Sequence, residues 1–193
     1  IEIWNMNVAE SPIPCGWLQQ HTDSVPSLSW NPLSRRSLLS CSVDGTAVIW
    51  HLDAMRPAAI FNLGHPRAEG VKFAEGKSVQ WNPRNAPVFG VGTNEGVFGY
   101  DVTTSGVQWS ALEGESIDSF AWLNDGRQFL ASTENGDLYW YDIAKIDTPV
   151  QVIKGHDDSI TSISVARYQP RQIVATTDIS GRCAIWDLTS GQA

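Results

Sequence analysis

Short stretches of alternating apolar and polar residues follow one another along the whole chain, and Gly, Pro, Asn and Asp separate them. Such alternation is typical of half-buried β-strands. In the clearest stretch it predicts strands at 25–30, 37–42, 46–50 and 58–62, with a hairpin turn at 43–46. A helical period is found nowhere over a useful length. The pattern therefore predicts an all-β fold with almost no helix.

The unit that contains these strands recurs, with changes, further along the chain. In its first copy, Trp30-Asn31-Pro32 leads to Asp44-Gly45 and then to Ile49-Trp50. The closing aromatic residues of the successive units are Trp50, Tyr100, Tyr141 and Trp186, at intervals of 50, 41 and 45 residues. A repeat of about 45 residues that closes with Trp-Asp is typical of one four-stranded β-propeller blade.

The repeats divide the chain into a single propeller domain with predicted blades at 15–53, 58–102, 107–143 and 149–188. Residues 1–14 hold a linker and the stretch 1–5, which has the apolar-Trp ending of a closing strand. We therefore expect a partial propeller of four blades plus one orphan strand of a preceding blade. Such an excerpt of a longer propeller would leave sheet edges exposed and prone to aggregation.

The chain resembles the WD-repeat family at Asp44-Gly45…Trp50 and at Gly155-His156…Trp186-Asp187. In that family a buried hydrogen-bond network joins a loop His, a strand Ser or Thr, a turn Asp and the closing Trp. The resemblance therefore implies structural roles for His21, Ser40 or Ser42, Asp44 and Trp50 in the first unit, and for His156 and Trp186 in the fourth.

The networks of the other units depart from this pattern. In the fourth unit, Asp178 and Ser180 exchange the serine and aspartate positions around Gly181. His65 could serve the second unit, whereas the third has no histidine. A set of His21, Asp44 and a serine could also form a hydrolase triad. The structural interpretation is favoured, because the set recurs at the repeat spacing beside Trp and would satisfy buried polar groups.

Taken in order, the units also resemble the periodic tryptophan protein family, through residues 1–5, 21–31, 42–46, 130–136 and 156–160. The resemblance implies a nuclear, nucleolar protein linked to large ribosomal subunit assembly, rRNA processing and ribosomal-DNA chromatin. The short linker after Trp4 and the enlarged loop at 64–76 depart from that family. A general WD adaptor that binds histones or chromatin, or a vesicle-coat scaffold, is the alternative.

The net charge is −8, and it is unevenly distributed. Residues 101–142 hold eight acidic residues and one basic residue, Arg127. Phosphate backbones require the opposite sign, so extensive direct nucleic-acid binding is disfavoured, and a basic ribosomal protein or histone tail is the favoured partner. The candidate partner-binding residues, in loops expected on one face, are Glu113, Glu115, Glu134, Asp157, Asp158 and Asp178. A solvated rim that only aids solubility is the alternative.

No pattern in the chain indicates a cofactor, a metal site or a membrane partner. Cys15, Cys41 and Cys183 lack metal-ligand spacing and suggest no disulfide framework, which favours a reducing intracellular compartment. No apolar run approaches the roughly 18 residues that cross a bilayer. An enzyme would need a nucleophile, a base and an oxyanion donor, and no such set is distinct from the repeat. We therefore expect a non-enzymatic binding protein.

Overall fold

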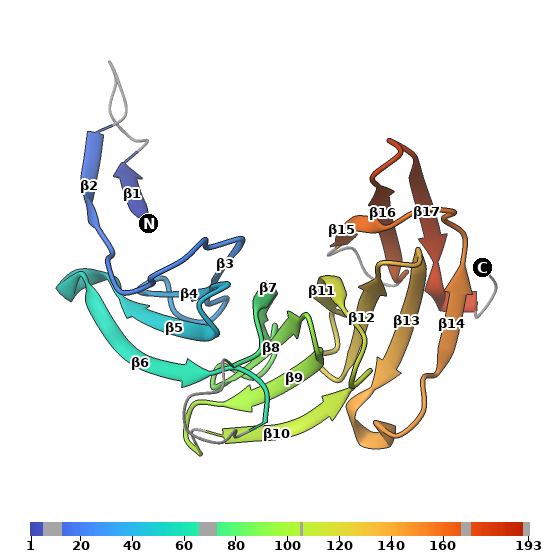
Figure 1. Ribbon diagram of the computed structural model, residues 1–193, viewed down its shortest axis with the longest axis horizontal. Coiled ribbons are helices and arrows are strands. Elements are labelled where there is room, and N and C mark those ends of the chain that lie inside the picture. The colour runs from blue at the N-terminus through green and yellow to red at the C-terminus, as the bar shows by residue number, and fades with distance from the viewer. Residues whose placement is uncertain (6–12, 66–72, 105, 167–170, 191–193) are drawn as a thin grey trace.

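A computed structural model of the chain forms an open arc of β-sheets (Figure 1). It describes residues 1–5, 13–65, 73–104, 106–166 and 171–190. Within these ranges the helical elements are three short 3-10 turns, η1 (Leu52–Ala54), η2 (Ile143–Lys145) and η3 (Leu188–Ser190). The prediction of an all-β, partial propeller fold is confirmed.

The described strands form five antiparallel sheets that follow one another in chain order. The hairpin sheet pairs β1 (Glu2–Asn5) with β2 (Ile13–Trp17). The first sheet contains β3 (Ser27–Trp30), β4 (Ser37–Cys41), β5 (Thr46–His51) and β6 (Arg56–Asn62). The second contains β7 (Gly76–Trp81), β8 (Val88–Thr93), β9 (Gly96–Asp101) and β10 (Gly106–Ala111). The third contains β11 (Ile117–Trp122), β12 (Gln128–Thr133), β13 (Asp137–Asp142) and β14 (Gln151–Lys154). The fourth contains β15 (Ile160–Val165), β16 (Ile173–Asp178) and β17 (Cys183–Asp187).

The outermost strand of a sheet comes from the start of the next sequence unit. Thus β6 pairs with β5, β10 with β9, and β14 with β13. The sheets therefore begin and end one strand later than the units 15–53, 58–102, 107–143 and 149–188. The same rule applies to β1, because its partner β2 comes from the start of the first unit and pairs with it through Glu2↔Trp17 and Asn5↔Ile13. This pairing corrects the expectation of an orphan strand, since hydrogen bonds from β2 satisfy one edge of β1.

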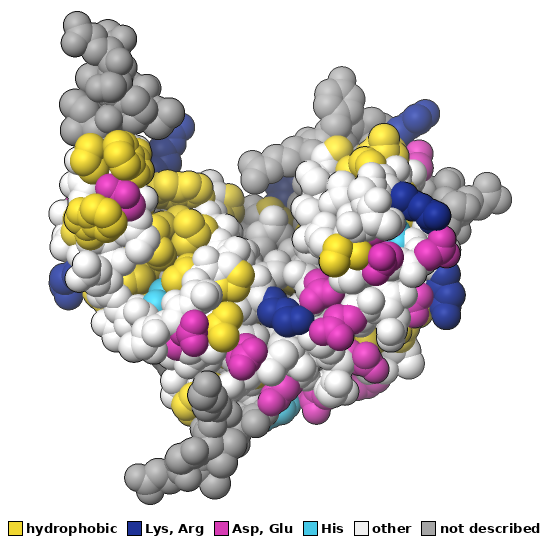
Figure 2. Space-filling model, turned by 45° about the horizontal axis from the view of Figure 1, so that its top comes forward, with side chains coloured by type: hydrophobic (Ala, Val, Ile, Leu, Met, Phe, Trp, Pro, Cys, Tyr) yellow, Lys and Arg dark blue, Asp and Glu magenta, His cyan; other side chains and the backbone are white. Residues whose placement is uncertain are grey.

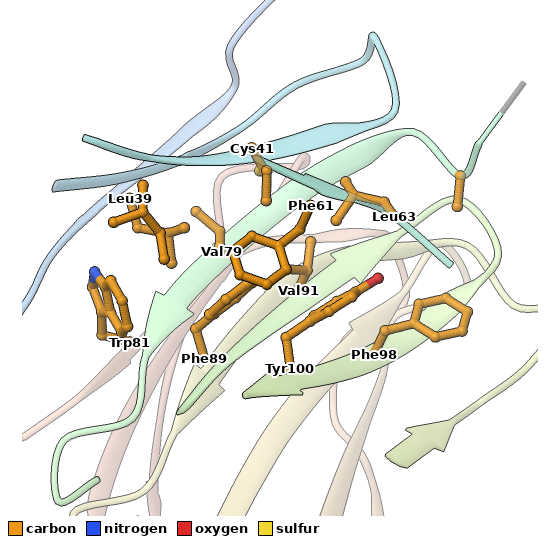
Figure 3. Close-up of a cluster of buried hydrophobic side chains, with 13 residues drawn as sticks. Leu39, Cys41, Phe61, Leu63, Val79, Trp81, Phe89, Val91, Phe98 and Tyr100 are labelled. Carbon is orange, nitrogen blue, oxygen red and sulfur yellow. The ribbon is translucent and has the colours of Figure 1, made fainter. Parts of the chain in front are cut away.

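Most of the apolar core lies between neighbouring sheets. At the junction of the first and second sheets, the ring centroid of Phe89 lies 5.1 Å from that of Phe61 and 5.1 Å from that of Tyr100 (Figure 3). Leu39 and Val91 are fully buried in the same cluster. Further clusters join the second sheet to the third, the third to the fourth, and the hairpin sheet to the first. The arc is therefore held together by the packing of one sheet on the next.

A serine at the same position of three inner strands adds a hydrogen bond to each junction. The hydroxyl oxygens of Ser27, Ser78 and Ser119 accept from the backbone N–H groups of Val79, Phe120 and Ile163, each at 3.1 Å. These N–H groups lie on inner strands, whose free edge has no strand partner. The bonds therefore fix the spacing of the sheets along the concave side of the arc, where the inner strands line a cavity of about 470 Å³.

Gly99 of β9 leaves room for an aromatic residue at the junction of the second and third sheets. The indole of Trp109, on the paired strand β10, occupies the space where a Cβ at position 99 would lie. The same indole stacks on Phe129 of the third sheet, with ring centroids 5.1 Å apart. A side chain at position 99 would therefore push Trp109 out of the junction.

Replacing Gly99 with valine is expected to lower the free energy of unfolding by about 1–3 kcal/mol, because the overpacked junction must rearrange. Gly106→Ala is the matched control, since a Cβ at position 106 would meet only the carbonyl oxygen of Thr104, at 3.9 Å. Urea denaturation followed by tryptophan fluorescence measures both variants. Equal stabilities for the two variants would contradict the packing described for Trp109.

Candidate functional site

His21 is the centre of a buried polar network in the first sheet. Its Nδ1 lies 3.0 Å from Oδ2 of Asp44, and its Nε2 lies 2.7 Å from Oγ of Ser40. The indole N–H of Trp50 donates to the same Ser40 oxygen at 2.9 Å. The side chains of His21 and Asp44 are only 4% and 9% exposed. The structure thus brings together a loop histidine, a strand serine, a turn aspartate and the closing tryptophan.

The surroundings of Asp44 keep it ionised. Burial opposes the charged form, but hydrogen bonds from Thr46, the Thr22 backbone N–H and His21 together lower the pKa of Asp44 below its usual value. The Thr46 backbone N–H and hydroxyl both donate to Oδ1, at 2.9 and 2.6 Å. The turn closes through Gly45, whose φ of 85° is readily adopted only by glycine. The carboxylate therefore joins the turn to the loop that carries His21.

Ser42 lies beside this network but does not contact His21. Its hydroxyl accepts from the Asp44 backbone N–H at 3.0 Å and donates to the carbonyl of Asp23 at 3.3 Å. The sequence did not decide which of the two serines joins the network, and the structure shows that Ser40 is the one between His21 and Trp50. Ser40 is fully buried, and its Oγ already contacts both rings. A substrate has no access to that oxygen, which argues against a hydrolase triad.

The fourth sheet holds a second network with the same connectivity. His156 Nδ1 lies 2.7 Å from Asp178 Oδ2, and its Nε2 lies 2.7 Å from the hydroxyl of Thr176, to which Trp186 Nε1 donates at 2.8 Å. Hydrogen bonds, first of all from His156, lower the pKa of Asp178 well below its usual range. The Ser180 hydroxyl also donates to Asp178, at 2.7 Å. Asp178 and Ser180, although exchanged relative to the first unit, therefore still form a hydrogen bond with each other.

Sequence reasoning missed Thr176 as a member of this network. The signal was present, because Thr176 precedes Trp186 by the same interval that separates Ser40 from Trp50. The exchange of Asp178 and Ser180 indicated a hydroxyl in the turn, whereas the hydroxyl of the network lies in strand β16. In both sheets the hydroxyl comes from the second strand, β4 or β16, which pairs with the strand that carries the closing tryptophan.

The second and third sheets are joined without a buried histidine. In the second, the Tyr100 hydroxyl accepts from the Gly64 backbone N–H at 2.8 Å. His65, the candidate for this unit, is instead exposed, and its Nε2 lies 3.1 Å from Glu113 Oε1. The expectation for His65 is therefore wrong, because the tyrosine hydroxyl reaches the loop backbone directly. In the third, Ser132 donates to the Ile160 carbonyl at 3.1 Å.

Five of the six candidate acidic residues are exposed in loops and turns of the second to fourth sheets: Glu113, Glu115, Glu134, Asp157 and Asp158. We call these five the acidic rim. Figure 2 shows acidic side chains spread over the centre and right of this view, with one basic side chain at the centre and others near the right edge. Asp178 does not belong to the group, because it is only 5% exposed and bonded to His156. Its proposed role in partner binding is therefore corrected to a structural one.

Three members of the acidic rim already have a basic neighbour. Glu113 pairs with His65, Glu134 with Lys77 at 3.4 Å, and Asp157 with Arg182 at 2.6 Å. In the part of the chain that the structure describes, no such ion pair involves Glu115 or Asp158. These two carboxylates are therefore the most available to a partner.

Lys77 ties the loops of this face into one surface. Its ammonium donates to Ser116 at 2.6 Å and to Asp118 at 2.9 Å, and the other oxygen of Asp118 accepts from the Ser159 hydroxyl at 2.6 Å. These contacts cross from the second sheet to the third and from the third to the fourth. The bonds of Asp118 and Glu134 raise the pKa of Lys77 against the opposing effect of burial.

The described residues contain no group of three or more His, Cys, Asp or Glu side chains that could hold a metal ion. Over the same residues, no helix is long and apolar enough to span a membrane. Burial raises the pKa of the Cys41 thiol to about 12, whereas Cys15 and Cys183 are exposed.

The sheets and networks agree with the matches to known proteins. The family model described as "WD domain, G-beta repeat" matches residues 13–51 and 147–187, the segments that hold the His21 and His156 networks. Residues 13–51 and 147–187 are therefore WD repeats within a partial β-propeller fold, as the resemblance to that family indicated.

Among individual proteins, the chain is similar to Periodic tryptophan protein 1 homolog of Drosophila melanogaster, with 24% identity over 182 residues, 90% of this chain and 37% of that protein. It is 27% identical to Periodic tryptophan protein 1 of Saccharomyces cerevisiae over 164 residues, 78% of this chain and 26% of that protein. It is also 23% identical to Histone acetyltransferase type B subunit 2 of Candida glabrata over 179 residues, 89% of this chain and 40% of that protein. The chain thus spans well under half the length of each relative.

Proposed function

We propose that the chain is a non-enzymatic WD-repeat scaffold for protein–protein interaction in the nucleus, acting in ribosome biogenesis and rRNA processing in the nucleolus. The observation that carries the scaffold role is the division of its polar residues. The His21, Asp44 and Ser40 side chains, which could have formed a triad, are buried in a structural network, as are His156 and Asp178, while exposed charges lie on the loops of the arc. Similarity to two periodic tryptophan protein 1 relatives supports the process.

Co-purification of the full-length protein from nuclear extract tests this proposal. Pre-ribosomal particles are the expected partners. The similarity to Histone acetyltransferase type B subunit 2 favours a second candidate, a chromatin adaptor that binds histones. Recovery of histones without ribosomal precursors would replace the first proposal by the second.

The acidic rim is the surface that we propose for a basic partner. Clustered like charge raises the encounter rate with a partner of opposite charge. The ion pairs of Glu134 and Asp157 and the bond of Glu113 to His65 occupy these three carboxylates, so Glu115 and Asp158 should contribute most. Contacts of Lys77 and Asp118 hold the loops of the rim in fixed positions before a partner arrives.

Replacing Glu113, Glu115, Asp157 and Asp158 with their amides is expected to weaken binding of a lysine-rich peptide by roughly tenfold and to flatten its salt dependence. Stability should stay within about 0.5 kcal/mol, because the four side chains lie on the surface. Glu115→Gln with Asp158→Asn should cause most of the loss. Fluorescence anisotropy at low and high salt measures the binding.

Asp53→Asn with Asp147→Asn is the control, because it also removes two exposed carboxylates but lies outside the acidic rim. The control should bind the lysine-rich peptide like the original chain. Equal binding by the original chain, the control and the amide variants would show that the rim serves only solubility.

A further inference from the structure

Ser110 is the only serine or threonine of the chain that has an acidic residue three positions after it. That residue is Glu113, and Glu115 follows at the fifth position. The same spacing can cap the start of a helix, but residues 112–116 lie in a turn. Protein kinases that select acidic sequences need carboxylates at these positions, where basic side chains of the kinase bind them. The residues around Ser110 therefore have the charge pattern of an acid-directed phosphorylation site.

The structure places Ser110 where an enzyme can reach it. It is a partly exposed residue near the end of β10, the outer edge strand of the second sheet (Figure 1). Its backbone pairs with Phe98 of β9 on one side, and within the described residues the other edge of β10 has no strand partner. Such an edge presents an extended chain with unpaired N–H and C=O groups, the form in which peptide segments are commonly bound.

The carboxylates that a kinase would recognise are also accessible. The Ser110 hydroxyl donates to Glu113 Oε1 at 2.5 Å, and His65 Nε2 lies 3.1 Å from the same oxygen. These two contacts, first of all the bond from Ser110, lower the pKa of Glu113 below its usual value, so its side chain is ionised. Glu113 and Glu115 are both exposed. A kinase can therefore bind both charges without unfolding the loop.

A phosphate on Ser110 would change the charge of the acidic rim more than any single side chain does. It carries about 1.5 to 2 negative charges at neutral pH. In its dianionic form it has no proton to donate to Glu113, so the bond between the two residues is lost and the two anions repel each other. His65 lies close enough to pair with the phosphate instead. Glu113 is then displaced towards solvent, where a basic partner can bind it.

We propose that an acid-directed kinase phosphorylates Ser110 and that the phosphate strengthens the binding of a basic partner to the acidic rim. In this step a base of the kinase accepts the hydroxyl proton and the Ser110 Oγ forms a bond to the γ-phosphorus of magnesium-bound ATP. The bond from that phosphorus to ADP breaks, and ADP leaves. The strengthening rests on the proposed function of the acidic rim, whereas the modification itself does not.

The modification is tested by incubating the folded chain with a purified acid-directed kinase and magnesium-ATP. Fragmentation mass spectrometry should assign a phosphate to Ser110, and Ser110→Ala should abolish it. Glu113→Gln with Glu115→Gln should slow the reaction by roughly tenfold or more, because the kinase loses both charged contacts. Melting temperatures show that each variant is folded.

Two controls show whether the sequence around Ser110 directs the kinase. Asp53→Asn with Asp147→Asn removes the same charge outside the acidic rim and should leave the rate unchanged. Ser116→Ala removes a serine of the same loop that has Ser119 three positions after it, and should also leave the phosphate on Ser110. No phosphate on Ser110, or equal rates for the two charge variants, would overturn the proposal.

The strengthening is tested by fluorescence anisotropy with a labelled lysine-rich peptide. The phosphorylated chain should bind it roughly tenfold more tightly than the unmodified chain at low salt, and the difference should shrink at high salt. Equal affinities of the two forms would overturn the proposed effect of the phosphate. Binding by neither form, with Ser110 phosphorylated, would reject the acidic rim as a binding surface and this effect with it, but would leave Ser110 as a phosphorylation site.

Discussion

Replacing Phe89 with alanine is expected to lower the free energy of unfolding by about 3–5 kcal/mol, the usual cost of removing a fully buried aromatic ring. The Phe89 side chain is completely buried and contacts the rings of Phe61, Trp81 and Tyr100, with centroids 5.1 to 5.7 Å apart. These residues come from both sheets of one junction (Figure 3). The cavity left by the substitution would therefore weaken the contact between the first and second sheets.

Chemical denaturation followed by far-ultraviolet circular dichroism measures this loss. Ile60→Ala is the control, because Ile60 is a large apolar residue of the first sheet that is half exposed. It should lose much less stability than Phe89→Ala. A loss below about 1 kcal/mol for Phe89→Ala would mean that the junction is not packed as the structure shows.

Replacing His21 with alanine is expected to cost about 1–3 kcal/mol, because the buried oxygens of Asp44 and Ser40 lose a hydrogen-bond partner. The Trp50 side chain and the turn at Asp44 should also become less ordered in the His21→Ala variant. Thermal melting measures the global effect, and hydrogen exchange of the Thr22 and Thr46 backbone N–H groups measures the local one, since both donate to Asp44.

His65→Ala is the matched control for His21→Ala. His65 is half exposed and forms one surface pair with Glu113, so its removal should leave the melting temperature nearly unchanged. Partner binding by the His21 variant should fall only as far as folding falls. An unchanged melting temperature together with lost partner binding would instead assign His21 to a functional site.

The strands were predictable because alternation is a local property of the chain. The predicted strands at 37–42 and 46–50 match β4 and β5 to within one residue. The strand predicted at 58–62 is longer in the structure, where β6 begins at Arg56 and includes Pro57. A proline is tolerated there because β6 is the outer edge of its sheet, where an N–H group has no strand partner.

The partners of the strands at the repeat boundaries were harder to predict. Strand β2 has the same pattern whether it opens the first unit or closes the hairpin sheet, and only its pairing with β1 distinguishes the two. Likewise, Ser40 and Ser42 point to the same face of β4 and its turn, so alternation does not choose between them. The position of Trp50, which reaches only Ser40, makes that choice.

The sequence by itself determined the class of this protein, because the repeat spacing, the alternation within strands and the recurring His, Asp and Trp are all visible along the chain. Only the tertiary structure decided which polar side chains remain exposed and able to contact a partner. Asp178 and Glu134 are both acidic residues near a turn, yet one is buried against His156 and the other is exposed beside Lys77. Burial and ion pairing depend on how neighbouring sheets pack, and residues far apart in the sequence set that packing.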